Sequence, residues 1–332
     1  MSTKAILEVE DLTVSIRLPG GKRATMVEDV SFHIDEGGTL GLVGESGSGK
    51  TTTGMAIMGV LPKQARVNSG RILLEGEDLV TKTPRQMTRI RGKRIAMMLQ
   101  DAMTALDPCY NVRSQLAPPL RQHRALRGDE LERELINSLE QVGLSAAASR
   151  LRQYPHQLSG GMRQRVASAV ALSGIPRLLI ADEPTSALDA TTQVRYLQLL
   201  QRLQEESGFG LLFVTHDLMI VRHLCARVIV MYAGQVVEEG PVEDVFTRPQ
   251  HPYTRALLDA IPSLGEDVES MRLETIEGRP PDITDEKVGC RFAPRCKYAH
   301  DTCREATPTL SERSLGARAR CWGTEPGGWV QL

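Results

Sequence analysis

The chain has 332 residues, which is enough for about two domains. Its 40 basic and 41 acidic residues nearly balance, so the composition speaks against a general nucleic-acid binder. No apolar run approaches the roughly 20 residues of a membrane-spanning helix, and residues 1–5 lack the apolar core of a secretion signal. We therefore expect a chain that stays on the cytoplasmic side, where partner proteins can hold it at a membrane.

The N-terminal part of the chain predicts strands followed by a strand–loop–helix unit. Residues 6–18 alternate loosely between apolar and polar, and Gly20 and Gly21 predict a turn back into a second strand. Residues 39–43 predict a short buried strand that runs straight into a glycine-rich loop. Residues 51–58 predict the helix that follows this loop.

The glycine-rich loop fits the phosphate-binding pattern G-x-x-x-x-G-K-[ST]. Glycine allows positive φ and close approach, so backbone N–H groups can converge on a phosphate, and the helix start adds its positive dipole end. We expect Lys50 to reach the β- and γ-phosphates of a nucleoside triphosphate and Thr51 to bind Mg²⁺. The expected nucleotide-binding residues are Gly44, Glu45, Ser46, Gly47, Ser48, Gly49, Lys50, Thr51 and Thr52.

The middle of the chain predicts helices and then two buried strands. Residues 129–142 place apolar side chains on one helical face, and Ser159 is suited to cap a helix that runs to about residue 173. Residues 178–181 and 211–215 are short apolar runs of the kind that buried parallel strands show.

Two acidic residues follow the first of these runs. Asp182 ends the predicted strand, at the edge where open α/β sheets bind ligands, and is expected to coordinate Mg²⁺. Glu183 comes next and is placed to polarise an attacking water. With the phosphate loop, this pair predicts hydrolysis of a nucleoside triphosphate.

Residues 158–164, LSGGMRQ, resemble the signature of ATP-binding-cassette (ABC) ATPases. Other elements of that family follow its order: Gln100 as the Q-loop glutamine, residues 186–189 as the D-loop and His216 as the switch histidine. The resemblance implies an α/β fold with a RecA-like P-loop core, an antiparallel β subdomain, a helical signature subdomain and a small Cys-rich C-terminal extension. It implies an ATPase domain at residues 1–245, with the helical subdomain at about 101–173, and the extension at 246–332.

The same resemblance implies a mechanism. Two such subunits enclose two ATP molecules head to tail, so that Ser159, Gly160 and Gly161 of one meet the γ-phosphate bound by the other. Glu183, His216 and Gln100 are the implied catalytic residues, and Gln100 is also an implied Mg²⁺ contact beside Thr51 and Asp182.

Three further segments look like the dipeptide/oligopeptide importer branch: residues 154–157, 231–234 and 251–258. This implies an ATPase subunit at the cytoplasmic face of the inner (plasma) membrane. Its implied partners are a related or identical second ATPase, two transmembrane permease subunits and an extracytoplasmic substrate-binding protein. Nickel chelates, opines, glutathione or oligosaccharides stay open as other cargo. A soluble ABC ATPase acting on nucleic acid or ribosomes is the rival class, and the single cassette and near-neutral charge disfavour it.

Two positions depart from the family pattern. Ile16 stands where an aromatic residue usually stacks on adenine, and no aromatic residue precedes Phe32. Because aromatic stacking on a base contributes about 1–3 kcal/mol in other systems, we expect modest nucleotide affinity and loose base selectivity. Ala102 replaces a common proline in the loop after Gln100.

Four cysteines near the C-terminus have the spacing C-x5-C-x6-C-x17-C: Cys290, Cys296, Cys303 and Cys321. A reducing compartment disfavours disulfides, and the C-x₂₋₄-C pairs of structural zinc sites are absent. An iron–sulfur cluster tolerates varied spacing, but the spacing alone does not choose between these alternatives. The resemblance to the peptide-importer branch implies a [4Fe–4S] cluster with a structural role, with Zn²⁺ or no metal as the alternatives.

Overall fold

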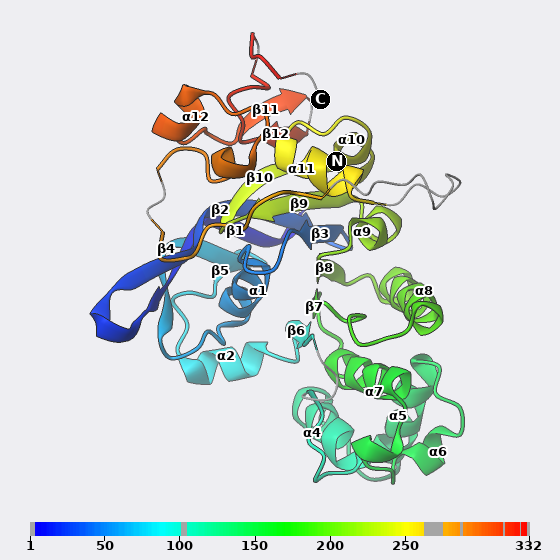
Figure 1. Cartoon of the computed structure of the whole chain (residues 1–332). Helices are drawn as coiled ribbons and strands as arrows, with labels where there is room; N and C mark the ends of the chain where they lie inside the picture. Colours follow the sequence, from blue (N-terminus) through cyan, green and yellow to red (C-terminus); the bar gives the residue numbers. More distant parts are fainter. Residues whose placement is uncertain are drawn as a thin grey trace.

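An eight-stranded sheet forms the centre of the computed structural model, which describes residues 4–100, 105–261, 275–285, 288–314, 316–325 and 327–330 (Figure 1). In spatial order its strands are β11 (Ser311–Ser314), β12 (Ala317–Ala319), β10 (Gln235–Pro241), β9 (Arg227–Tyr232), β3 (Thr39–Val43), β8 (Gly210–Thr215), β7 (Leu178–Asp182) and β6 (Ile95–Met98). The five strands from β9 to β6 are parallel, and they are almost wholly buried, as strands covered on both faces must be.

A second, antiparallel sheet has the order β2 (Arg23–Asp35), β1 (Ala5–Arg17), β4 (Ala65–Leu74) and β5 (Glu77–Asp78). Its first hairpin turns at Gly20 and Gly21, whose φ values of +82° and +83° favour glycine. Apolar side chains from this sheet join α1 and one face of the central sheet in a buried cluster. This sheet has the antiparallel architecture that the sequence predicts.

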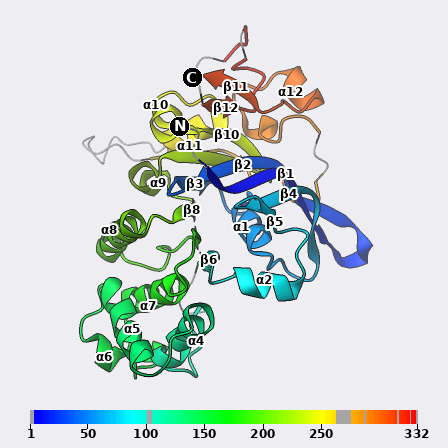
Figure 2. The ribbon, with the colours of Figure 1, turned by 180° about the vertical axis from the view of Figure 1, so that it is seen from behind.

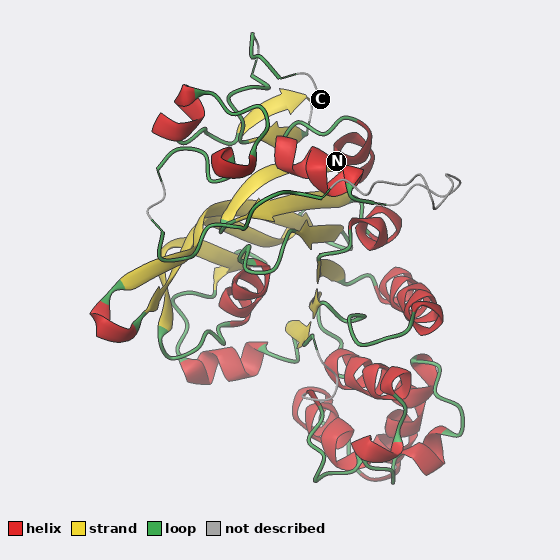
Figure 3. Ribbon diagram, viewed as in Figure 1, coloured by secondary structure: helices red, strands yellow, loops and turns green. Residues whose placement is uncertain are grey.

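The helices fall into three groups (Figure 3). Those beside the central sheet are α1 (Lys50–Met58), α2 (Pro84–Ile90), α8 (Ala190–Ser207), α9 (Leu218–Leu224), α10 (Val242–Thr247) and α11 (Pro252–Asp259). A separate group at one end holds α4 (Val112–Arg124), α5 (Gly128–Gln141), α6 (Ala147–Arg150) and α7 (Gly160–Leu172), as both ribbon views show (Figures 1 and 2). The C-terminal segment adds α12 (Asp301–Glu305). None of the described helices combines the length and the apolar character of a membrane span.

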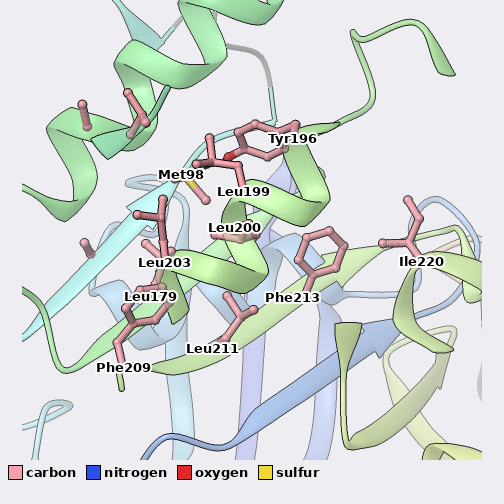
Figure 4. Packing of buried hydrophobic residues seen from close by; sticks show 14 of the residues in the cluster. Met98, Leu179, Tyr196, Leu199, Leu200, Leu203, Phe209, Leu211, Phe213 and Ile220 are labelled. Carbon is pink, nitrogen blue, oxygen red and sulfur yellow. Dashed lines mark hydrogen bonds between the residues drawn. The ribbon is translucent and has the colours of Figure 1, made fainter. Parts of the chain in front are cut away.

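Helix α8 links the helical group to the central sheet (Figure 4). Its leucines at 199, 200 and 203 are buried with Leu179 and Phe213 of the sheet. Tyr196, from the same helix, is 1% exposed, and its Oη lies 2.8 Å from Ser168 Oγ of α7. The buried hydroxyl pair satisfies both polar groups and connects α7 to the core.

The C-terminal segment continues the central sheet. Strand β12 pairs antiparallel with β10, with Glu238 opposite Ala319 and Glu239 opposite Arg318. Because β12 lies next to β10, residues beyond 289 pack near β9 and the turn that joins β9 to β10. Strand β9 also supports the phosphate loop.

Most local expectations are confirmed. Strand β3 spans the predicted residues 39–43, α5 buries its leucine face, and Ser159 caps α7 by accepting a hydrogen bond from Met162 N at 3.3 Å. Ala102 lies outside the described residues, as do residues 262–274 and 286–287. The domain boundaries at 245 and 246, and the helical subdomain at about 101–173, stay predictions.

Candidate functional site

The predicted phosphate loop connects β3 to α1 and packs closely against neighbouring strands. Gly44 has a φ of +151°, and a Cβ there would lie 2.2 Å from the carbonyl oxygen of Met231. At Gly49, φ is +102° and a Cβ would lie 3.0 Å from the carbonyl oxygen of Met26. Side chains at either position would displace backbone, so glycine is required for the loop to lie this close to β9 and β2.

Lys50 is the first residue of α1, and its side chain reaches back to the start of the loop. Its Nζ donates hydrogen bonds to the carbonyl oxygens of Gly44 at 2.8 Å and Glu45 at 3.0 Å. The residue is 5% exposed, and burial lowers the pKa of its ammonium, although Glu183 and Asp182 partly offset that effect. Triphosphate oxygens would give this desolvated cation stronger acceptors than backbone carbonyls.

Thr51 and Asp182 form the pair expected to bind Mg²⁺. The Thr51 Oγ1 lies 3.2 Å from Asp182 Oδ1, and Asp182 is 2% exposed. Burial raises the pKa of Asp182, and the hydrogen bond from Thr51 opposes that shift. A hydroxyl and one carboxylate suit Mg²⁺, which commonly binds one or two protein oxygens together with phosphates and waters.

The three expected catalytic residues meet at one point. Glu183 Oε2 accepts a hydrogen bond from Gln100 Nε2 at 2.9 Å, and Glu183 Oε1 lies 3.2 Å from His216 Nδ1. The Glu183 side chain is 15% exposed, and its backbone has a left-handed φ of +44°. This orientation directs the carboxylate toward the phosphate loop, since Glu183, Gln100 and His216 line the same pocket as that loop.

That pocket has an empty volume of about 1180 Å³. It is lined by Met26, Ser46, Gly47, Ser48, Gly49, Lys50, Thr51, Thr52, Gln100, Glu183, His216 and Ile283. Sequence reasoning missed Met26 and Ile283. Ile16 is instead half-buried in β1, opposite Ala24 and Ala65, and is not among the lining residues. The expectation of loose base selectivity stays a prediction.

The signature residues lie elsewhere on the chain. Ser159 and Gly160 are exposed at the start of α7, and neither they nor Gly161 line the pocket. Gly161 faces α8 so closely that a Cβ would lie 2.7 Å from Thr192 Cγ2. Exposed N–H groups at a helix start form an anion-binding surface, which a single chain does not bring to its own phosphate loop.

Two residues that the sequence did not single out for the site contact Glu45. The backbone N–H of Glu45 donates to Tyr253 Oη at 2.9 Å, and the Glu45 carboxylate is bound by Arg295. Tyr253 lies in a segment already noted for family resemblance. Arg295 is 250 residues away in sequence and carries no local signal.

The four C-terminal cysteines line one cavity with an empty volume of about 330 Å³. All four are free thiols, and burial raises the pKa of Cys290 to about 12 and that of Cys296 to about 11. The predicted convergence is therefore present. However, no group of three or more His, Cys, Asp or Glu within the described ranges is arranged to hold a metal ion. The structure supports a shared cysteine cavity and does not show an iron–sulfur or zinc site.

Comparisons with known proteins agree with this arrangement. The chain matches the ABC transporter family model over residues 27–186 and the model of the oligopeptide/dipeptide transporter C-terminal region over residues 237–303. It is 44% identical over 331 residues to a putative peptide import ATP-binding protein of Brucella ovis, covering 97% of this chain and 98% of that protein. It is 46% identical over 295 residues to a probable peptide ABC transporter ATP-binding protein of Sinorhizobium fredii, covering 88% of each.

Solved structures show the same fold. One is the dimeric post-hydrolysis structure of the ATP-binding cassette MJ0796 bound to ADP and Pi. It is 29% identical in sequence to this chain, with a TM-score of 0.64, and the match covers 71% of this chain and 98% of the MJ0796 chain. The cbiO1 protein from Clostridium perfringens, part of the cbiONQ transporter complex, is 28% identical with a TM-score of 0.63, covering 74% and 92%. The fold class expected from the sequence is confirmed.

Proposed function

The chain belongs to the ABC transporter family, and from this premise we propose that it is the ATP-hydrolysing subunit of an importer of di- or oligopeptides. One observation carries the proposal most directly: Lys50, Thr51 and the Gln100–Glu183–His216 cluster line one pocket, and Asp182 lies within hydrogen-bond distance of Thr51. The match to the oligopeptide/dipeptide C-terminal region and the names of the relatives favour peptide as cargo.

Each residue has a role in the proposed reaction. Lys50 and the loop N–H groups bind the β- and γ-phosphates, and Thr51, Asp182 and Gln100 hold Mg²⁺, which would neutralise phosphate charge. Glu183 orients and polarises the attacking water, while His216 contacts the γ-phosphate from the other side of the carboxylate. Gln100 connects this cluster to the surface that receives a transporter helix.

The exposed signature residues complete the site of a second ATPase. In the proposed closed state, Ser159, Gly160 and Gly161 supply N–H and hydroxyl donors to the γ-phosphate bound by the partner. ATP binding then favours closure, hydrolysis releases it, and the motion is passed to two permease subunits at the cytoplasmic face of the inner membrane. The second ATPase is related or identical, and an extracytoplasmic binding protein delivers the cargo.

A reconstituted transporter tests the proposed cargo. We expect the complex of this chain with its proposed permease and binding-protein partners to import radiolabelled di- and tripeptides into ATP-loaded vesicles. Uptake of a nickel chelate, opine, glutathione or oligosaccharide without peptide uptake would keep the importer and replace the cargo. ATPase activity stimulated by nucleic acid or ribosomes, with no uptake of any cargo, would favour the soluble rival class.

For the cysteine cavity we propose a structural [4Fe–4S] cluster, with Zn²⁺ as the alternative. Four thiols lining one cavity supply the number of ligands that either group needs. The preference for the cluster comes from the resemblance of this segment to the peptide-importer branch. Burial raises the pKa of the Cys290 and Cys296 thiols, so their deprotonation would be coupled to binding of the positively charged iron.

Replacing Cys303 tests this proposal. Cys303→Ser is expected to lower iron content and brown colour and to reduce the melting temperature by several degrees, because one ligand of a structural group is lost. At a temperature where the variant is still folded, its rate of ATP hydrolysis should change little even though its melting temperature is lower. Cys109→Ser is the matched control, since Cys109 is exposed and is not one of the residues lining the cavity. Zinc without iron in the anaerobically purified protein would overturn the cluster, and a stable but inactive Cys303→Ser variant would overturn its structural role.

A further inference from the structure

An arginine of the C-terminal segment binds the phosphate loop directly. Arg295 has a side chain that is 4% exposed, and it ends the short 3₁₀ turn Ala293–Arg295. Its Nη1 donates to Glu45 Oε2 at 2.7 Å and its Nη2 donates to Glu45 Oε1 at 3.0 Å. The contact is a bidentate, charge-assisted pair, and these hydrogen bonds raise the pKa of Arg295.

The guanidinium is itself held in place by its other donors. Arg295 Nε donates to the Glu277 carbonyl at 2.9 Å, Nη2 donates to the Ile276 carbonyl at 3.2 Å, and Nη1 donates to Tyr232 Oη at 3.2 Å. Ile276 and Glu277 belong to the segment that precedes the four cysteines, and Tyr232 is the last residue of β9. Arg295 therefore presents Glu45 with a fixed donor pair.

Glu45 is restrained from a second side by Tyr253. The Tyr253 hydroxyl, which accepts from Glu45 N–H, belongs to a fully buried side chain packed on Tyr232 and Phe292 at ring-centre distances of 4.6 and 5.4 Å. The Glu45 carbonyl accepts from Lys50 Nζ. Arg295 therefore contacts Glu45, and Glu45 in turn contacts Lys50, the cation expected to bind the phosphates.

The same C-terminal segment reaches the pocket at Ile283. A turn closes around this residue, because Asp282 N–H donates to Asp285 Oδ2 at 2.7 Å and Thr284 N–H donates to Asp282 Oδ1 at 2.9 Å. Ile283 and Met26 are the large apolar side chains among the described residues that line the pocket. Because Ile16 does not line it, these two side chains are the apolar surface available to a base.

We infer that the C-terminal extension forms part of the nucleotide site of its own chain, with Arg295 as a positioning residue for the phosphate loop and Ile283 as a contact for the base. The inference rests on the proposed function in taking ATP as the ligand. Arg295 acts in two ways: it restrains the loop through Glu45, and it neutralises a carboxylate that would otherwise repel the triphosphate.

Calorimetric titration of the purified full-length chain separates the two contacts, with Mg²⁺–AMP-PNP and Mg²⁺–tripolyphosphate as probes. Arg295→Met is expected to raise the Kd of both probes about tenfold, because it acts on the loop that binds phosphate. Ile283→Asn is expected to raise the Kd of AMP-PNP about fivefold and to leave that of tripolyphosphate unchanged, because the substitution adds no charge and tripolyphosphate has no base. Glu45→Gln combined with Arg295→Met should recover part of the affinity that Arg295→Met loses, because it removes the carboxylate that Arg295→Met leaves unpaired.

Arg313→Met is the matched control. The Arg313 side chain is also 4% exposed, but its hydrogen bonds go to the carbonyls of Ala319 and Cys321, within the extension. We expect it to lower thermal stability without changing either Kd. Equal weakening by Arg313→Met and Arg295→Met, or a folded Arg295→Met variant with unchanged Kd values, would overturn the inference. If the unmodified chain binds neither probe, the proposed ATPase function itself fails.

Discussion

Glu183→Gln is expected to lower ATP turnover at least about 100-fold while leaving ATP bound, since general-base catalysis commonly contributes factors of this size or larger. Glutamine keeps the shape of the side chain and still offers an oxygen to Gln100, which lies 2.9 Å from Glu183 in the structure. It removes the negative charge that would polarise the attacking water. Phosphate release by the assembled transporter measures turnover, and ATP retained after rapid desalting measures binding.

Loss of turnover with retained ATP should also trap the closed ATPase pair, because hydrolysis no longer releases it. Glu243→Gln provides a control, since Glu243 is a largely exposed glutamate of α10 that pairs with Arg222 at 3.5 Å, away from the pocket. Its turnover should match that of the unmodified protein. Near-normal hydrolysis by Glu183→Gln would show that another group activates the water.

Lys50→Ala is expected to abolish measurable ATP binding, with an increase in Kd of about 100-fold or more, since charge-assisted hydrogen bonds to several phosphate oxygens are lost together. The effect should exceed that of Arg295→Met, which acts on the loop through Glu45. Titration with Mg²⁺–AMP-PNP measures the affinity, and circular dichroism with thermal unfolding verifies the fold.

Lys50→Arg tests what the position requires. Arginine keeps the positive charge, but Lys50 is 5% exposed and its Nζ is held between two loop carbonyls, so a planar guanidinium should fit poorly. We expect intermediate affinity. If a folded Lys50→Ala variant bound AMP-PNP as tightly as the unmodified chain, the phosphates would have to lie elsewhere.

The central strand, the phosphate loop and its helix could be predicted from the sequence because their signals are local. The apolar run at 39–43 and the glycine pattern after it specify a strand, a tight loop and a helix start within 20 residues. The same holds for Ser159, whose capping role depends on residues three positions away. Helix α5 was also predictable, because its buried leucines follow the helical period.

The contacts made by the C-terminal extension could not be predicted in this way. Arg295 contacts Glu45 only because the extension lies against β9 and continues the sheet through β12. No sequence motif around either residue indicates that the two are in contact. The same is true of Ile283, which a turn far along the chain brings to the pocket. For the cysteines, spacing predicted a shared site but left its occupant open, because thiolates bind both zinc and iron.

The central claim is that ATP is held between the phosphate loop of one ATPase and the signature helix of the other. The most direct test is a cryo-electron microscopy structure of the assembled transporter carrying Glu183→Gln with Mg²⁺–ATP. The account predicts Ser159 of this chain within hydrogen-bond distance of a γ-phosphate bound by the second ATPase, with Lys50 on the ATP of its own loop. ATP bound at Lys50 while the two signature helices face away from both nucleotides would contradict it.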